Sequence, residues 1–156
     1  MTLSPETLSQ APPLKRAVRS PFRQAEVKVL LLEDDGEDAA IIQDALERYP
    51  GTNFTVRRVD RLRRAIDYLR RSNADVAIVD LFLPDGRGVE VPEAIHSTAP
   101  GLPFVVLTGI RDEEIGLIAI EAGAQDFICK SEMTPVSLSR AIKFAIERAR
   151  SRGRRP

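Results

Sequence analysis

The stretch VKVLLLEDDGEDAAIIQDALERY, residues 27–49, decides how the rest of the sequence is interpreted. Its first part, Val27–Glu33, is an apolar run that is too short for a helix and is typical of a buried strand. From Asp38 onward, apolar residues recur at the spacing of one helix face until Pro50 and Gly51 stop the pattern. The stretch therefore predicts a strand followed by a helix, which is one unit of an α/β fold.

Short apolar runs and amphipathic segments continue to alternate along the chain. We expect further strands over 54–59, 74–79, 104–107 and 127–129, and further helices over 62–69, 89–99, 113–122 and 135–150. Strands that are apolar throughout and separated by helices indicate a parallel sheet covered on both faces. The predicted class is therefore an α/β fold with five parallel strands in a doubly wound sheet. In such a sheet, ligands bind outside the carboxyl ends of the strands.

The two ends of the chain differ from this repeating pattern. Residues 1–25 contain four prolines and no apolar periodicity, so we expect a disordered or loosely docked extension there. Residues 151–156 are polar and basic, and we interpret them as a tail. The folded domain is then expected over residues 26–150, a length that can bury a sizeable core.

Composition argues against several classes of function. The longest apolar runs are far shorter than the ~20 residues of a membrane span, and no secretory signal pattern is found. Cys129 is the only cysteine, which excludes an internal disulfide and makes the reducing cytoplasm the expected location. Residues 29–139 carry 20 acidic and 11 basic side chains. Such an acidic body argues against binding of nucleic acid and favours binding of a cation.

Polar and charged residues stand where the predicted strands end. Glu33 and Asp34 follow the first strand, Asp80 the third, Thr108 the fourth and Lys130 the fifth. Because the carboxyl ends of parallel strands meet at one edge of a sheet, we expect these side chains to converge. Clustered carboxylates repel one another unless a cation neutralises them. Hard oxygen ligands without histidine or cysteine suit Mg²⁺, or Mn²⁺ in its place.

These residue types fit the transfer of a phosphoryl group onto an aspartate. Asp80 can act as the nucleophile, while Lys130 and the metal offset the charge of the arriving group. The Thr108 hydroxyl can then donate to a phosphoryl oxygen. Each residue alone has an ordinary explanation, because acids after strands are often turn residues or helix N-caps and a single lysine is often only solvated. Their joint occurrence at the ends of different strands favours a site.

Four segments, in this order and spacing, resemble the receiver domain of bacterial response regulators, the CheY-like domain of two-component signalling. They are VLLLEDDGEDAAII (29–42), VAIVDLFLPDGRG (76–88), FVVLTG (104–109) and AGAQDFICK (122–130). The resemblance covers about residues 27–150. It implies a flavodoxin-like (βα)₅ fold with strand order 2-1-3-4-5. It also implies that a histidine kinase or a histidine phosphotransfer protein donates the phosphoryl group.

The resemblance implies roles for the residues that carry the reaction. Asp80 matches the phosphoacceptor, Lys130 the lysine that pairs with phosphate, and Thr108 the switch hydroxyl. Phe127 matches the aromatic residue that rotates with this switch, although the family more commonly has tyrosine there. The family usually has proline after the lysine, in a cis peptide. Here Ser131 follows, and a cis bond before a residue other than proline costs ~2.5–4 kcal/mol, which favours a trans bond with a shifted loop but leaves the isomer open at this point.

The resemblance also implies a set of metal ligands. Asp34 and Asp80 match direct ligands, Glu33 matches a residue that acts through water, and Phe82 matches the position whose backbone carbonyl binds the metal. Phosphatases that use an aspartyl nucleophile normally carry a second aspartate two residues after it, where this chain has Phe82. We therefore do not expect an enzyme that turns over a phosphate ester.

The sequence thus predicts a phosphorylated switch whose output surface is formed by the fourth helix, the fifth strand and the fifth helix. We expect this surface to bind a protein partner or to form a homodimer. Two alternatives remain open at this point. The chain could be an interaction module that has the fold but signals without phosphorylation, or the receiver of a longer regulator with an output domain.

Overall fold

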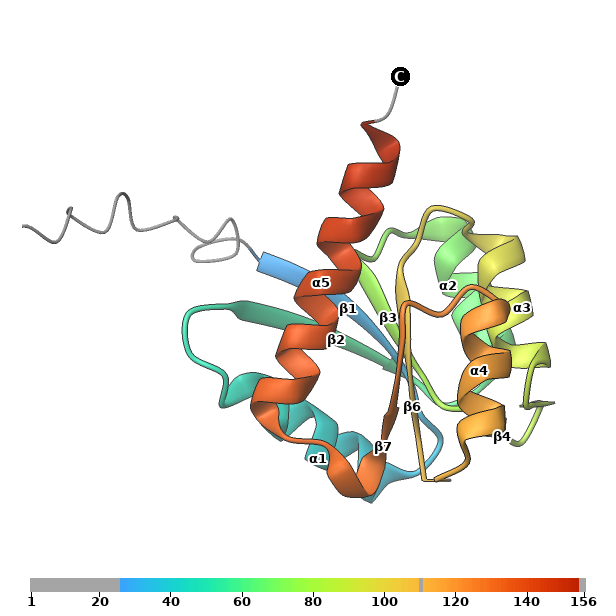
Figure 1. The fold of residues 1–156 in the computed structure, drawn as a ribbon, viewed down its shortest axis with the longest axis horizontal. Helices are drawn as coiled ribbons and strands as arrows, with labels where there is room; N and C mark the ends of the chain where they lie inside the picture. The colour runs from blue at the N-terminus through green and yellow to red at the C-terminus, as the bar shows by residue number, and fades with distance from the viewer. Residues whose placement is uncertain (1–25, 110, 155–156) are drawn as a thin grey trace, which may run out of the picture.

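The computed structural model describes residues 26–109 and 111–154 (Figure 1). The extension expected over residues 1–25 and the last two residues of the expected tail lie outside this range. The described helices and strands follow the predicted alternation. In chain order they are β1 Glu26–Leu32, α1 Gly36–Glu47, β2 Asn53–Val59, α2 Leu62–Arg71, β3 Val76–Val79, β4 Phe82–Leu83, β5 Gly86–Arg87, α3 Glu90–Thr98, β6 Phe104–Thr108, α4 Glu113–Glu121, β7 Asp126–Cys129 and α5 Pro135–Gly153.

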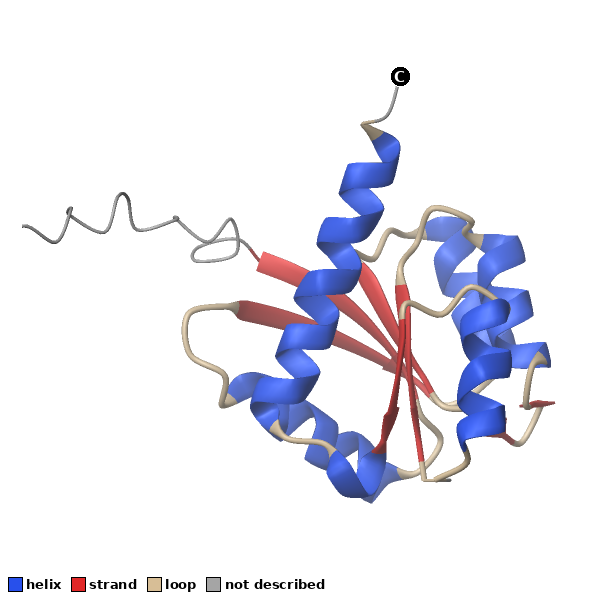
Figure 2. Cartoon of the chain, viewed as in Figure 1, coloured by secondary structure: helices blue, strands red, loops and turns tan. Residues whose placement is uncertain are grey.

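Five of the strands form one parallel sheet with the order β2-β1-β3-β6-β7. Because β6 and β7 are the fourth and fifth strands of this sheet along the chain, the expected order 2-1-3-4-5 is confirmed. Helices cover both faces (Figure 2), with α1 and α5 on one and α2, α3 and α4 on the other. One apolar cluster fills each interface, and the alternate residues of β1 and β3 are divided between the two clusters. The doubly wound α/β prediction is therefore correct.

Local signals in the sequence set the ends of the helices that border the site. The Asp35 carboxylate accepts hydrogen bonds from the backbone N–H groups of Glu37 and Asp38, both at 2.9 Å, and so caps α1. For Asp35, the ordinary role of an acid that follows a strand, a helix N-cap, is thus the correct one. Thr134 and Ser137 form a reciprocal capping box at the start of α5. The helix α5 continues through Gly153, past the end of the domain expected at residue 150.

Two short elements next to the site were not predicted. Strands β4 and β5 form a two-stranded antiparallel hairpin directly after Asp80, and a 3₁₀ turn over Lys130–Glu132 follows β7. Both are too short to leave a periodic pattern in the sequence. Asp85, at the tip of the hairpin, accepts hydrogen bonds from the backbone N–H groups of Leu62 (2.8 Å) and Arg63 (3.0 Å). A residue distant in sequence therefore caps α2 and fixes the loop that follows Asp80.

No helix in the described ranges is long and apolar enough to cross a membrane.

Candidate functional site

Two buried carboxylates lie side by side at the carboxyl end of the sheet. Leu32 of β1 is in register with Val79 of β3, and the backbone N–H of Asp80 donates to the Leu32 carbonyl at 3.0 Å. The residues that follow these partners are Glu33 and Asp80, which are 0% and 6% exposed. Charged side chains are rarely this buried unless they are paired. The sheet register therefore forces two acids into one place that needs a cation.

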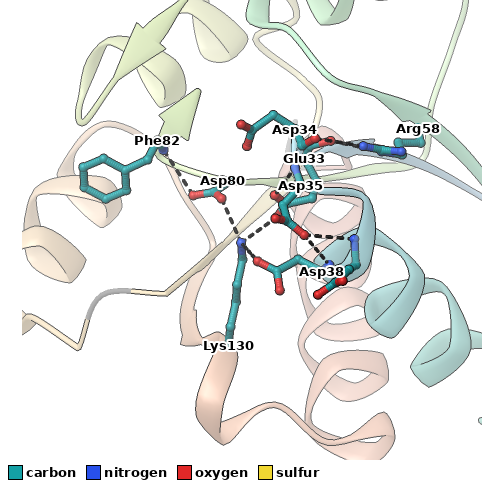
Figure 3. A network of polar contacts seen from close by, with 9 residues as sticks. Glu33, Asp34, Asp35, Asp38, Arg58, Asp80, Phe82 and Lys130 are labelled. Carbon is teal, nitrogen blue, oxygen red and sulfur yellow. Dashed lines mark hydrogen bonds and ion pairs between the residues drawn. The ribbon is translucent and has the colours of Figure 1, made fainter. Parts of the chain in front are cut away.

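Lys130 supplies a positive charge at this place. Its ammonium lies 2.7 Å from Glu33 Oε2, 2.8 Å from Asp38 Oδ2 and 2.9 Å from Asp80 Oδ2 (Figure 3). The peptide bond between Lys130 and Ser131 is trans. The lysine reaches the acceptor carboxylate with this trans bond, and a 3₁₀ turn begins at Lys130 itself. The ammonium donates hydrogen bonds to Asp38 and Asp80, and its contact with the buried Glu33 carboxylate is an ion pair.

Burial and charge act on these groups in opposite directions. Burial raises the pKa of the Glu33 carboxyl, and the nearby Lys130 ammonium opposes this rise only in part. Burial alone would lower the pKa of Lys130, but its three carboxylate partners outweigh that effect and raise the pKa above its usual value. Lys130 is therefore firmly cationic at neutral pH.

The acidic side chains can also hold a metal ion. Carboxylate oxygens of Glu33, Asp34 and Asp80 lie within 4.8 Å of one another. Asp34 is exposed and forms no ion pair within the described ranges, so its carboxylate is open to a ligand. A site of carboxylate oxygens alone suits Mg²⁺ or Mn²⁺, which keep several waters in their coordination. The donor set therefore fits the predicted metal.

The backbone after Asp80 also contacts the acceptor carboxylate. The N–H of Phe82 donates to Asp80 Oδ1 at 3.1 Å, which leaves the other acceptor oxygen to Lys130. The carbonyl of Phe82 remains the predicted backbone ligand of the metal. The Phe82 side chain is partly exposed and points away from the acids (Figure 3).

Sequence reasoning missed two residues of this site. Arg58, near the end of β2, donates from Nε to the Glu33 carbonyl (3.1 Å) and from Nη2 to the Asp34 carbonyl (3.0 Å). It therefore holds the turn that carries both acids. Asp38 was expected only to begin a helix, yet it is one of the three partners of Lys130. A faint signal existed for Arg58, because the second strand of such a sheet ends beside the first.

Thr108 and Phe127 lie on β6 and β7, the two strands that follow β3 in the sheet. Thr108 is fully buried, and its Oγ1 has no hydrogen-bond partner among the residues that the structure describes. It is in register with Cys129, and Phe127 is in register with Val106. The Phe127 ring packs against Gly116 of α4, where an added Cβ would lie 3.1 Å from the ring. A buried hydroxyl without a partner among the described residues thus ends β6, and an aromatic ring on β7 packs against α4.

Comparisons with known proteins agree with this arrangement. A family model described as the response regulator receiver domain matches residues 29–143. The chain belongs to this family, whose members are receiver domains of two-component response regulators. Receiver domains bind Mg²⁺ at an acidic cluster, and the group formed by Glu33, Asp34 and Asp80 could hold such an ion.

Individual relatives give the extent of the similarity. The probable transcriptional regulatory protein TcrX of Mycobacterium tuberculosis is 35% identical over 104 residues, 67% of this chain and 43% of TcrX. A cyclic di-GMP phosphodiesterase of Thermotoga maritima is 36% identical over 111 residues, 70% of this chain and 27% of that protein. The chain therefore spans less than half of either curated relative.

A solved structure is similar as well. The crystal structure of the phosphorylated cyanobacterial phytochrome response regulator RcpA superposes with a TM-score of 0.62 and 29% identity. The match covers 77% of this chain and 91% of RcpA.

Proposed function

We propose that this receiver accepts a phosphoryl group on Asp80, in a step that requires Mg²⁺, from a histidine kinase or a histidine phosphotransfer protein in the cytoplasm. The observation that carries the proposal is the contact between Asp80 and Lys130. A nearly buried carboxylate lies 2.9 Å from an ammonium and within a group of acids that can hold a divalent cation. Stability alone does not call for this arrangement, since buried ion pairs seldom improve it over apolar packing.

The residues divide the work of the transfer as follows. One Asp80 oxygen attacks phosphorus, while the bond from phosphorus to the donor nitrogen breaks and its electron pair leaves with the donor imidazole. Lys130 moves its hydrogen bond from Asp80 to a phosphoryl oxygen and offsets the charge that arrives. Asp34, Asp80 and the Phe82 carbonyl would hold Mg²⁺ directly and Glu33 would act through water, and the ion would supply further positive charge.

The switch follows from the buried hydroxyl of Thr108. A phosphoryl oxygen on Asp80 offers the Thr108 Oγ1 an acceptor, and the hydroxyl has none among the described residues. Movement of Thr108 leaves space beside β6 that the Phe127 ring can fill. Because that ring packs on Gly116, its rotation changes the surface formed by α4, β7 and α5.

This surface has the character of a protein interface. A groove of about 760 Å³ lies there, with Leu117 and Ile120 of α4 and Phe127 and Ile128 of β7 in its lining. Leu117 is 66% exposed, and the Phe144 side chain of α5 is 56% exposed. Exposed apolar side chains that gather into one patch are typical of interaction sites. We propose that phosphorylation promotes binding of a protein partner, or a homodimer, through this face.

Mass spectrometry of the intact protein tests the transfer. Incubation with acetyl phosphate and Mg²⁺ should add the mass of one phosphoryl group, and EDTA should prevent the addition. Asp80→Asn should abolish it, whereas Asp75→Asn, at the other end of β3, should not. Labelling of Asp80→Asn to the level of the wild type would refute the assignment. An absence of labelling in every protein would favour an interaction module that works without phosphate.

A further inference from the structure

Asp38 differs from the other two partners of Lys130 in its exposure to solvent. Its side chain is 40% exposed, whereas those of Glu33 and Asp80 are 0% and 7% exposed. Asp38 lies in the first turn of α1, and its carboxylate meets the ammonium at 2.8 Å (Figure 3). It is therefore the partner that a molecule entering from solvent meets beside the acceptor.

The charge of Asp38 is not needed to hold a metal or to accept the phosphoryl group. The group of acids that can bind a cation consists of Glu33, Asp34 and Asp80. Arg58, the other cation at these loops, donates to backbone carbonyls and forms no ion pair with Asp38 within the described ranges. Asp38 thus places a third carboxylate beside the ammonium and takes one of its hydrogen bonds.

We propose that Asp38 determines which phosphodonors can react with Asp80, an inference that rests on the proposed function. Its charge repels donors that arrive as dianions, such as acyl phosphates. A donor whose phosphoryl group is on a protonated nitrogen carries one less negative charge and is repelled less. Asp38 therefore favours donors with a nitrogen–phosphorus bond, the bond that a phosphorylated histidine presents, over small acyl phosphates in solution.

Two small phosphodonors of different charge test whether Asp38 repels a dianion more than a monoanion. Acetyl phosphate is a dianion near pH 7 and loses acetate when the carboxylate attacks phosphorus. Phosphoramidate is a monoanion with a protonated nitrogen. When the carboxylate attacks phosphorus, that nitrogen leaves as neutral ammonia. Both place the same group on the same oxygen. The ratio of their rates therefore reports the charge near the acceptor rather than the competence of the nucleophile.

The experiment compares the rates of phosphorylation of the wild type, Asp38→Asn and Glu37→Gln by mass spectrometry. The concentration of Mg²⁺ is raised until the rate no longer depends on it, because loss of a charge also changes metal affinity. Glu37 is exposed in the same helical turn and forms no ion pair in the described part of the chain, so its variant is a control for net charge. Melting temperatures verify that all three proteins are folded.

Asp38→Asn should react about 5–10-fold faster with acetyl phosphate at low salt and about 2–3-fold faster with phosphoramidate, because the second donor carries half the charge. The difference should shrink in 1 M salt, where charges are screened within about 3 Å. Glu37→Gln should match the wild type. Equal acceleration with both donors, unchanged rates, or slower reaction of Asp38→Asn would each overturn the inference. If the wild type itself is not labelled at Asp80, the proposed function fails instead.

Discussion

The two ends of the parallel sheet are formed by the same strands but differ in whether charged side chains are buried there. At the carboxyl end, Glu33, Asp80 and Thr108 are buried polar side chains. The only other buried polar side chain that the structure describes is Ser139 of α5, and none belongs to the loops at the amino end. There, Asp75 is half-buried and accepts a hydrogen bond from the backbone N–H of Lys28 at 2.8 Å. Burial of charge is therefore confined to one end.

This difference separates the part of the molecule that stabilises the fold from the part that carries the chemistry. The apolar clusters on the two faces of the sheet bury the strands against the helices and account for the fold. The buried acids oppose folding, since a carboxylate taken from water loses hydration that only a good partner replaces. Sites for chemistry commonly carry such a cost in stability. Variants at the two ends should consequently respond in different ways.

The largest effect is expected from loss of the central cation. Lys130→Met should slow phosphorylation by about 100-fold or more. Without metal it should also lower the free energy of unfolding by about 2–4 kcal/mol, because the acids around it lose their partner. Lys28→Met, at the amino end, should change stability by less than about 0.5 kcal/mol. Urea unfolding in EDTA measures the free energy of unfolding of both variants. Equal stability of the two variants would remove the contrast between the two ends of the sheet.

Metal binding gives the next effect in size. Mg²⁺ at 100 times its Kd should stabilise the wild type by about 2.7 kcal/mol, since it binds only the folded state. Asp34→Ala should remove most of this gain, and Asp75→Asn at the amino end should keep it. Thermal melts with and without Mg²⁺ provide the comparison. A gain that is the same in all three proteins would place the bound ion elsewhere.

A smaller effect separates a functional buried hydroxyl from an ordinary one. Thr108 and Ser139 are both fully buried, and neither hydroxyl has a hydrogen-bond partner in the described ranges. Thr108→Val and Ser139→Ala should each leave the unphosphorylated protein as stable as the wild type, or up to about 1 kcal/mol more stable. Only Thr108→Val should prevent the α4–β7–α5 surface from changing after phosphorylation. If the two variants had the same effect on stability and on the change of this surface after phosphorylation, the switch role of Thr108 would be contradicted.

The smallest effect concerns a charge at the carboxyl end that serves stability. Burial opposes ionisation of Asp85, but the backbone N–H groups of Arg63 and Leu62 outweigh it and lower the pKa of the carboxyl. Its contribution to stability is therefore present above the ordinary aspartate pKa and is lost as pH falls through the lowered value. Asp85→Ala should cost about 1 kcal/mol at pH 7. This cost should vanish in strong acid, as urea unfolding across pH can establish.

Much of this molecule could be predicted from its sequence, for physical reasons. Apolar strands between amphipathic helices allow few arrangements, and residues at the strand ends converge in all of them. Glu33, Asp80 and Lys130 were found in this way. Asp38 was not, because a first-turn acid is expected to favour the helix dipole, and its contact with Lys130 depends on the turn after β7. Arg58 was missed because it acts on backbone carbonyls, which no residue type marks, and its place near the end of the second strand was only a faint signal.

The boundaries were harder to predict than the elements. The hairpin of β4 and β5 spans too few residues to show a period of two. The helix α5 exceeds its expected end because Ser151–Gly153 continue the helix as exposed residues, without an apolar stripe to mark them.

The central claim is that charge placed on Asp80 alters the α4–β7–α5 surface. Amide NMR spectra with Mg²⁺ and beryllofluoride, a mimic of the acyl phosphate, test it most directly. In the wild type, the signals of Gly116 and Phe127 should shift, while those of Asn73 and Gly101 at the amino end should remain. Asp80→Asn should show none of these shifts. Shifts confined to the loops around Asp80, or equal shifts in the variant, would contradict the account.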